Sequence, residues 1–87
     1  MNKDIENAIA LLYDKEIHNA PVVVSKGEKL LAKKMVFLAK KYNVPIVEDE
    51  ETAKMLMELD IGREIPYSLY RAVSIILGHV YKLKESL

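Results

Sequence analysis

The 87-residue chain contains no cysteine and no tryptophan, and it has only three glycines and three prolines. Without cysteine it can form no disulfide, thiolate metal site or cysteine nucleophile, which fits a reducing cytoplasm. No apolar run approaches the ~18 residues of a membrane span, and the charged start is not a signal peptide. Thirteen basic and thirteen acidic residues give a net charge of zero. This balance argues against a nucleic-acid partner, because phosphate contacts need a positive excess.

The residues that are present suffice for a hydrophobic core. Hydrophobic residues make up 51% of the chain, and a chain of this length forms one domain that buries roughly 60% of its unfolded surface. The sequence shows no repeat, linker or low-complexity stretch. We therefore expect a single domain over residues 1–87.

The spacing of apolar residues alternates between the period of a strand and the period of a helix. The predicted strands are residues 6–13, 21–25 and 45–48. The predicted helices are residues 28–42, residues 50–59 and a last helix that starts at Pro66. The first helix has apolar residues at i, i+4, i+7 and i+11, namely Leu31, Met35, Leu38 and Tyr42. The acidic run at residues 48–51 suits the start of the second helix, where carboxylates meet the positive end of the helix dipole.

The unit from residue 22 to residue 47 reads as strand, helix and strand with short connections. Such a crossover is right-handed and places its two strands parallel in one sheet. The predicted fold class is therefore α/β, a small mixed or parallel three-stranded sheet packed by three helices. A sheet this narrow leaves an exposed edge, which is a template for pairing with another chain.

The sequence offers no site for catalysis, a metal or a cofactor. His18 and His79 are far apart and predict surface or partly buried side chains rather than metal ligands. Gly27 precedes a helix, but a phosphate-binding loop needs a second glycine and a Lys-Ser/Thr pair. We therefore interpret Gly27 as the residue of a tight strand-to-helix turn. The lysines of residues 26–41 form a solvated face or a surface for another protein.

Four segments in order resemble the cytoplasmic domain of the FlhB/YscU family, the export-switch proteins of flagellar and injectisome type III secretion. These segments are AIALLYD, NAPVVVSKG, NVPIVED and IGREIPYSLYRAV, and together they run from about Ala8 to Leu83. Family members carry an N-terminal membrane domain, a linker and this domain, which cleaves itself at an Asn-Pro-Thr-His turn. The matching positions here are Lys3, Asp4, Ile5 and Glu6. None of them supplies the asparagine amide, so the resemblance predicts no self-cleavage.

The resemblance also implies a chain that begins where a cleaved family member's C-terminal fragment begins. Such a chain lacks the strand that precedes the cleavage turn, which leaves the edge of the first strand open for self-association or for a partner's strand. The family's apolar patch, which takes short hydrophobic export signals, maps onto Ala20, Pro21, Ser74 and Leu77.

The expected function is a non-catalytic, soluble, cytoplasmic interaction module of the flagellar or injectisome export apparatus. Its expected partners are export-apparatus proteins or export substrates, without nucleic acid and without a membrane span. The alternative is a small RNA-binding α/β domain, some of which also join a helix to a strand through Val-Pro.

Overall fold

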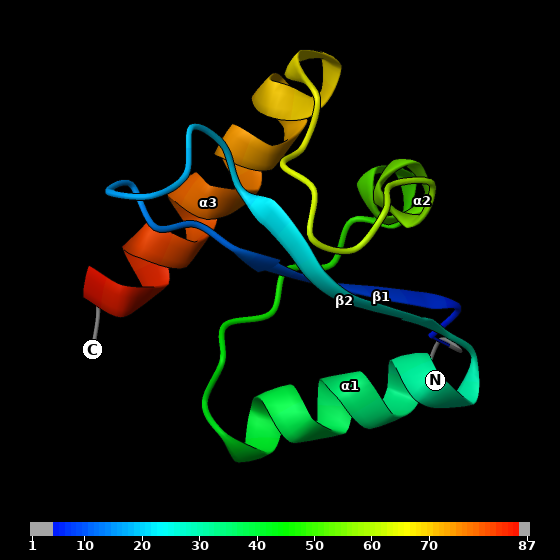
Figure 1. Cartoon of the computed structure of the whole chain (residues 1–87). Helices are drawn as coiled ribbons and strands as arrows, with labels where there is room; N and C mark the ends of the chain where they lie inside the picture. The colour runs from blue at the N-terminus through cyan, green and yellow to red at the C-terminus, as the bar shows by residue number, and fades with distance from the viewer. Residues whose placement is uncertain (1–4, 86–87) are drawn as a thin grey trace.

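The computed structural model describes residues 5–85, in which a two-stranded sheet lies between helices. Lys3 and Asp4, where the resemblance predicts loss of the cleavage motif, lie outside the described residues. The elements are β1 (Asn7–Leu12), β2 (Val22–Glu28), α1 (Leu30–Lys41), α2 (Glu50–Met57), the 3-10 helix η1 (Tyr67–Leu69) and α3 (Tyr70–Glu85). Figure 1 shows α1 on one side of the strands, with α2 and the start of α3 on the other. None of the helices in this part of the chain is both long and apolar enough to span a membrane.

The two strands form an antiparallel hairpin whose register runs from Asn7 opposite Glu28 to Leu12 opposite Val22. The register shifts between Ala10 and Leu11, because Val24 is an extra residue on β2 at this point. Such a bulge bends the strand and increases its twist. The predicted α/β class and the three helices are confirmed, whereas the predicted three-stranded sheet is wrong for the described residues.

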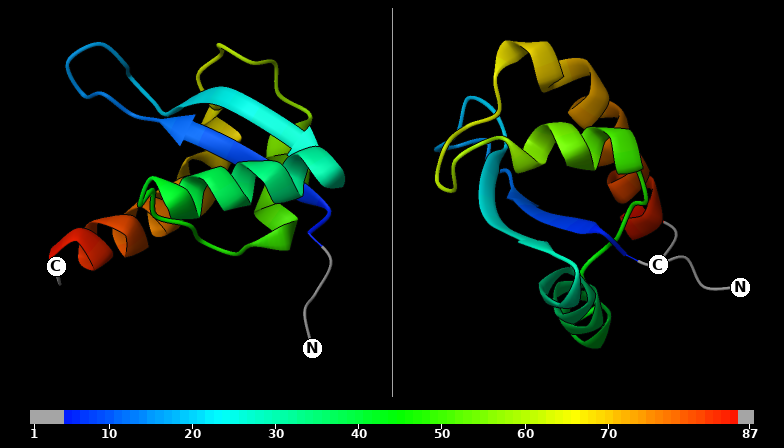
Figure 2. Two further views of the ribbon diagram at one scale, coloured as in Figure 1. Left: turned by 90° about the horizontal axis from the view of Figure 1, so that it is seen from below. Right: turned by 90° about the vertical axis from the view of Figure 1, so that its right-hand side faces the viewer.

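The predicted third strand at residues 45–48 is an irregular segment, so the crossover from residue 22 to residue 47 creates no parallel pair. Local composition favoured a strand, but a strand exists only when its backbone groups have a ladder partner. No described residue pairs with this segment as a strand, and Pro45 has no N–H to donate. The segment nevertheless runs along the β1 side of the sheet, as both views of Figure 2 show.

Gly27 lies inside β2 and does not end it, which corrects the turn predicted at this position. A Cβ atom at residue 27 would come within 2.6 Å of Leu31 Cγ and 3.0 Å of Met35 Sδ. The absence of a side chain therefore lets α1 fold back close to the strand from which it leaves. The chain reverses two residues later at Lys29, whose φ of 53° lies in the left-handed region.

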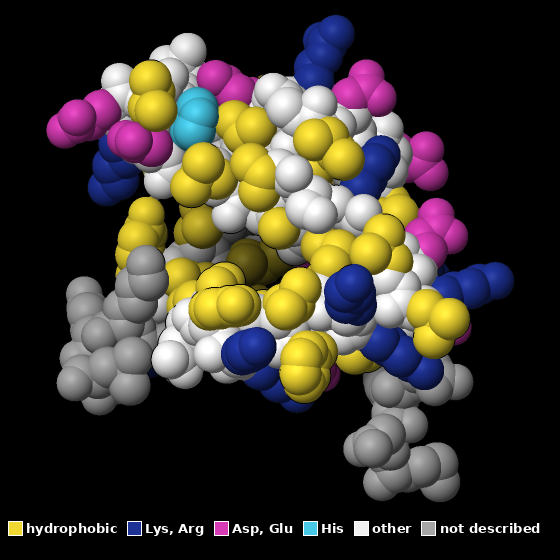
Figure 3. Space-filling model, turned by 60° about the horizontal axis from the view of Figure 1, so that its bottom comes forward, with side chains coloured by type: hydrophobic (Ala, Val, Ile, Leu, Met, Phe, Trp, Pro, Cys, Tyr) yellow, Lys and Arg dark blue, Asp and Glu magenta, His cyan; other side chains and the backbone are white. Residues whose placement is uncertain are grey.

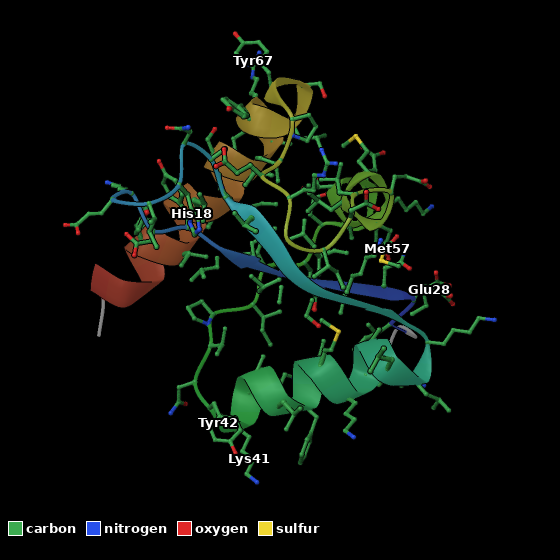
Figure 4. All side chains as sticks on the ribbon, viewed as in Figure 1. His18, Glu28, Lys41, Tyr42, Met57 and Tyr67 are labelled. Carbon is green, nitrogen blue, oxygen red and sulfur yellow. The ribbon has the colours of Figure 1, made fainter. Side chains whose placement is uncertain are left out.

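Helix α1 does not bury the face that its apolar spacing predicted. Ala32 is its buried residue, while Leu31 is 53% exposed and Tyr42, just beyond the helix, is 68% exposed. The buried face is thus centred one position away from the predicted stripe, where a small side chain permits close approach to the sheet. Figure 4 shows Lys41 and Tyr42 at the far end of α1, directed away from the strands.

The hydrophobic core lies on the other side of the sheet. Its buried members come from the end of the hairpin loop, from α2 and from the chain leading into α3: Ala20, Leu56, Ile65, Leu69 and Val73. Partly buried side chains pack around them, namely Ile9, Leu11, Leu59 and Leu77. Leu69 of η1 and Val73 of α3 therefore direct the apolar side of the last helical segment into the core.

Helix α2 starts at a side-chain cap. The acidic run at residues 48–51 predicted this helix start without indicating which residue forms the cap. Asp49 Oδ1 accepts a hydrogen bond from the backbone N–H of Thr52 at 3.1 Å, and Asp49 Oδ2 accepts one from Thr52 Oγ1 at 2.9 Å. These bonds favour the ionised carboxylate and lower the pKa of Asp49. The cap fixes where the chain turns from the irregular segment into α2.

Candidate functional site

The loop between the strands is closed by its own hydrogen bonds beside α3. The backbone N–H of His18 donates to Asp14 O at 2.7 Å, and the N–H of Asp14 donates in return to His18 Nδ1 at 3.0 Å. Lys15 Nζ lies 6.0 Å from the centroid of the Tyr81 ring, so the loop reaches the C-terminal half of α3. Figure 4 shows His18 at this junction. His18 is partly buried and thus helps to hold the loop together.

The first half of the predicted patch lies at the entry to β2. Ala20 is 2% exposed and belongs to the core, and Pro21 is buried. The carbonyl of Pro21 accepts a hydrogen bond from the N–H of Ile65 at 2.8 Å. These two residues therefore form a fixed base and present little side-chain surface of their own.

The second half of the patch lies on α3. Leu77 is half-buried and packs against the core cluster that contains Ala20. Ser74 is exposed, and its Oγ donates to the backbone carbonyl of Arg71 at 2.8 Å. The structure thus brings Leu77 to the same cluster as Ala20, and it turns Ser74 toward solvent.

The two edges of the sheet differ in how far they are covered. On β2, the outward backbone groups of Val23 bond to Arg63 O at 3.1 Å and to Gly62 N at 2.7 Å. On β1, the pairing with β2 shows which backbone groups face outward. Lys29 N donates to Glu6 O at 2.9 Å. In an antiparallel ladder, the two residues of every second opposed pair then exchange hydrogen bonds, and the residues between them point away from the partner strand. The residues whose N–H and C=O face away from β2 are Asn7, Ile9 and Leu11. Among residues 5–85, no backbone hydrogen bond reaches these groups from the outer side.

Lys26 has a role that the sequence did not reveal. The sequence placed it among solvated lysines, but its Nζ donates to Met57 O at 2.9 Å and to Leu59 O at 2.7 Å. The Met57 carbonyl ends α2 and the Leu59 carbonyl lies just beyond it, where a cation is favoured by the helix dipole. Its position in a strand, where side chains alternate between the two faces, was the only available signal.

The described residues hold no group of three or more histidine, aspartate or glutamate side chains placed to bind a metal ion. A shallow depression near Arg63 is lined by residues of both charge signs, Glu58, Asp60, Arg63 and Glu64, together with Leu59 and Pro66. The surface instead presents the outer backbone edge of β1 and several exposed apolar side chains. Exposed large hydrophobic residues include Ile17 at 73% and Phe37 at 65%.

Fold and surface together define a small α/β domain with a two-stranded hairpin, in which the outer edge of β1 receives no backbone hydrogen bond from residues 5–85. The model of the FlhB HrpN YscU SpaS family matches residues 5–80, and the chain belongs to this family.

Two bacterial relatives share between 38% and 40% of the aligned residues with this chain. The flagellar biosynthetic protein FlhB of Aquifex aeolicus is 40% identical over 79 residues, which cover 90% of this chain and 23% of that protein. The uncharacterized protein YlqH of Bacillus subtilis is 38% identical over 82 residues, covering 94% of this chain and 88% of that protein. The chain therefore spans about a quarter of that FlhB and most of YlqH.

Among solved structures, the cytoplasmic domain of FlhB from Shewanella putrefaciens matches with a TM-score of 0.89 and 30% sequence identity. The match covers 93% of this chain and 64% of that domain.

Proposed function

We propose that this protein is a non-catalytic interaction module of the flagellar or type III protein export apparatus, acting in the cytoplasm on export substrates or gate components. The match to the cytoplasmic domain of a flagellar FlhB, over 93% of this chain, supports this role. Among residues 5–85 no group of three or more acidic or histidine side chains could hold a metal ion, whereas exposed apolar side chains are available.

The proposed ligand is a short hydrophobic segment, and the proposed site is the patch of Ala20, Pro21, Ser74 and Leu77. The observation that carries it is the position of Leu77, half-buried against the cluster that contains Ala20. A ligand on this patch would meet the accessible side of Leu77 and the hydroxyl of Ser74, above a base held by the Pro21–Ile65 hydrogen bond. Burying apolar side chains of the ligand here supplies the affinity.

The test measures binding of a fluorescent peptide, carrying the hydrophobic export signal of a flagellar substrate, by fluorescence polarisation. We expect Leu77→Asp to weaken binding at least about tenfold, because a carboxylate would lose solvation beside an apolar ligand. Ile75→Asp is the matched control, since Ile75 is 57% exposed on the same helix. Circular dichroism verifies that both variants fold.

Ser74 gives a second variant that does not disturb the core. Ser74→Ala removes a hydroxyl that binds only its own helix backbone, so we expect tighter binding of the hydrophobic peptide. Ser74→Glu should weaken it. Equal affinities for the parent, Leu77→Asp and Ser74→Glu would refute the site.

The alternative of an RNA-binding domain has no specific observation in its favour. It drew on a helix joined to a strand through Val-Pro, but residues 45–48 form no strand. The net charge is zero, whereas phosphate binding depends on a cationic surface. Retention on heparin at moderate salt would reverse this judgement.

A further inference from the structure

Helix α1 directs two large apolar side chains away from the rest of the described chain. Its sheet-facing side carries the buried and partly buried residues of the helix, namely Ala32, Met35, Val36 and Ala39. At 3.6 residues per turn, the opposite side carries residues spaced i, i+4, i+7 and i+11, namely Leu30, Lys34, Phe37 and Lys41. Leu30 is 80% exposed and Phe37 is 65% exposed. The outward side of a surface helix is normally polar, so packing within the described chain does not explain these two residues.

The apolar surface of α1 continues onto one flank of the helix. Leu31 is 53% exposed, Leu38 is 40% exposed and Tyr42 is 68% exposed. Figure 3, in which the α1 side comes forward, shows hydrophobic and basic side chains next to one another there. Single exposed apolar residues are common on protein surfaces, but a contiguous group of them marks an interaction site.

The same surface is basic. From Lys29 to Val47 the chain has five lysines and no acidic residue, which leaves eight basic against thirteen acidic residues in the rest of the chain. The acidic residues that flank this stretch lie elsewhere in space. Glu28 ends β2, on the strand side of α1 (Figure 4). The acidic run at residues 48–51 leads into α2, which lies on the other side of the strands (Figure 1). The outward side of α1 therefore attracts anions.

We propose that α1 docks on an anionic membrane surface. Leu30 and Phe37, about 10 Å apart along the helix axis, enter the boundary between headgroups and acyl chains. Lys34 and Lys41 alternate with them, extend their apolar stems along this boundary and place their ammonium groups among the lipid phosphates. The inference goes beyond the proposed role in export and uses a surface separate from the Leu77 patch.

The alternation of apolar and basic side chains along α1 favours a bilayer over a protein partner. An anionic bilayer accepts an apolar side chain and a cation within one helical turn at any point of its surface. A folded protein would need a groove with carboxylates at the matching spacing. A second copy of this chain would bring lysines against lysines, which repel one another.

The first measurement is co-sedimentation with vesicles of pure phosphatidylcholine or of equal parts phosphatidylcholine and phosphatidylglycerol. We expect at least about tenfold tighter binding to the anionic vesicles, because each lysine near an anionic surface contributes about fivefold. Added salt should weaken this binding. Equal binding to the two kinds of vesicle, or no binding to the anionic ones, would overturn the proposal.

Matched variants test whether α1 makes the contact. Phe37→Ser should weaken binding to the anionic vesicles at least about tenfold, since an aromatic side chain no longer leaves water. Tyr67→Ser is its control, because Tyr67 is 85% exposed on η1. Lys34→Glu should also weaken binding about tenfold or more, whereas Lys54→Glu, an equal charge change at an exposed residue of α2, should leave it almost unchanged. Equal effects within either pair would contradict docking through α1.

The second measurement uses the absence of tryptophan from the chain. Phe37→Trp places a single indole on the outward side of α1, and we expect its emission to shift to shorter wavelength when anionic vesicles are added. Tyr67→Trp should show no shift. An unshifted emission of Phe37→Trp at vesicle concentrations that bind the protein would mean that α1 does not face lipid.

Two further outcomes would identify another occupant and overturn the proposal. Self-association of the free protein in sedimentation velocity, abolished by Phe37→Ser, would assign the surface to a second copy. Binding to soluble poly-glutamate as tight as binding to anionic vesicles would assign it to an acidic protein. Phe37→Ser should keep the parent's affinity for the hydrophobic export-signal peptide, so failure of membrane docking and failure of the Leu77 patch can be told apart.

Discussion

Replacing Lys26 with methionine tests how α2 is held on the sheet. The ammonium group donates to the carbonyls of Met57 and Leu59, which lie more than thirty residues away in sequence. Methionine keeps most of the apolar stem and removes both hydrogen bonds and the positive charge at the helix end. The change therefore isolates the contribution of the ammonium group.

The expected loss follows from the geometry. A hydrogen bond from a charged group contributes about 1.5–3 kcal/mol when it is buried, and a cation at a helix C-terminus adds about 0.3–1 kcal/mol. The group is only partly buried and one ammonium makes both bonds, so water replaces part of the interaction. We expect the free energy of unfolding to fall by about 2 kcal/mol.

The assay is urea denaturation followed by far-UV circular dichroism, since the chain has no tryptophan. With an m-value of about 1–1.5 kcal/mol/M for a domain of this size, the midpoint should fall by about 1.5 M. Lys34→Met on the exposed face of α1 is the matched control and should change stability by less than about 0.5 kcal/mol. Equal midpoints for the two variants would refute the anchoring role of Lys26.

Three further predictions concern other local features. Gly27→Ala should lower the free energy of unfolding by about 1–2 kcal/mol, because its Cβ would collide with Leu31. Gly78→Ala, where a Cβ meets open space, should raise the free energy of unfolding by up to about 1 kcal/mol. Thermal denaturation measures both changes. Asp49→Ala should lower the melting temperature at neutral pH. Folding lowers the pKa of Asp49, so the difference in melting temperature between parent and variant should be complete above the ordinary carboxyl pKa. It should disappear as the pH falls through the lowered pKa of the folded protein. A difference in melting temperature that persists in acid would contradict the cap. Finally, intact mass after prolonged incubation at neutral pH should show one unbroken chain, and a break within residues 1–8 would disprove the predicted loss of self-cleavage.

The helices and the hairpin strands were predictable because each depends mainly on neighbours in sequence. Helical spacing and an acidic start indicated α2, and Asp49 supplies the cap there. Alternating and β-branched residues indicated β1 and β2, whose observed bounds differ from the predicted ones by up to three residues. For the patch, the resemblance to the family named four residues as neighbours. The sequence could not predict how far each of their side chains is exposed.

What failed depended on contacts between distant segments. Residues 45–48 have the composition of a strand, but a ladder partner decides whether they become one. The fully buried residue of α1 is Ala32, one position from the predicted stripe, although Leu31 and Met35 of that stripe lie close to Gly27 of β2. The link from Lys26 to the end of α2 joins two segments whose proximity no local pattern encodes.

The two sides of the sheet bury unequal amounts of apolar side chain, so they should differ in the free energy needed to open them. Helix α1 contributes a single buried residue, Ala32, whereas the core cluster joins Ala20 to α2 and α3. Detaching α1 exposes little apolar surface, so its amides can exchange through a local opening of low free energy while the remaining helices stay folded. We therefore expect the half that contains α1 to open at a lower free energy than the half built on α2 and α3.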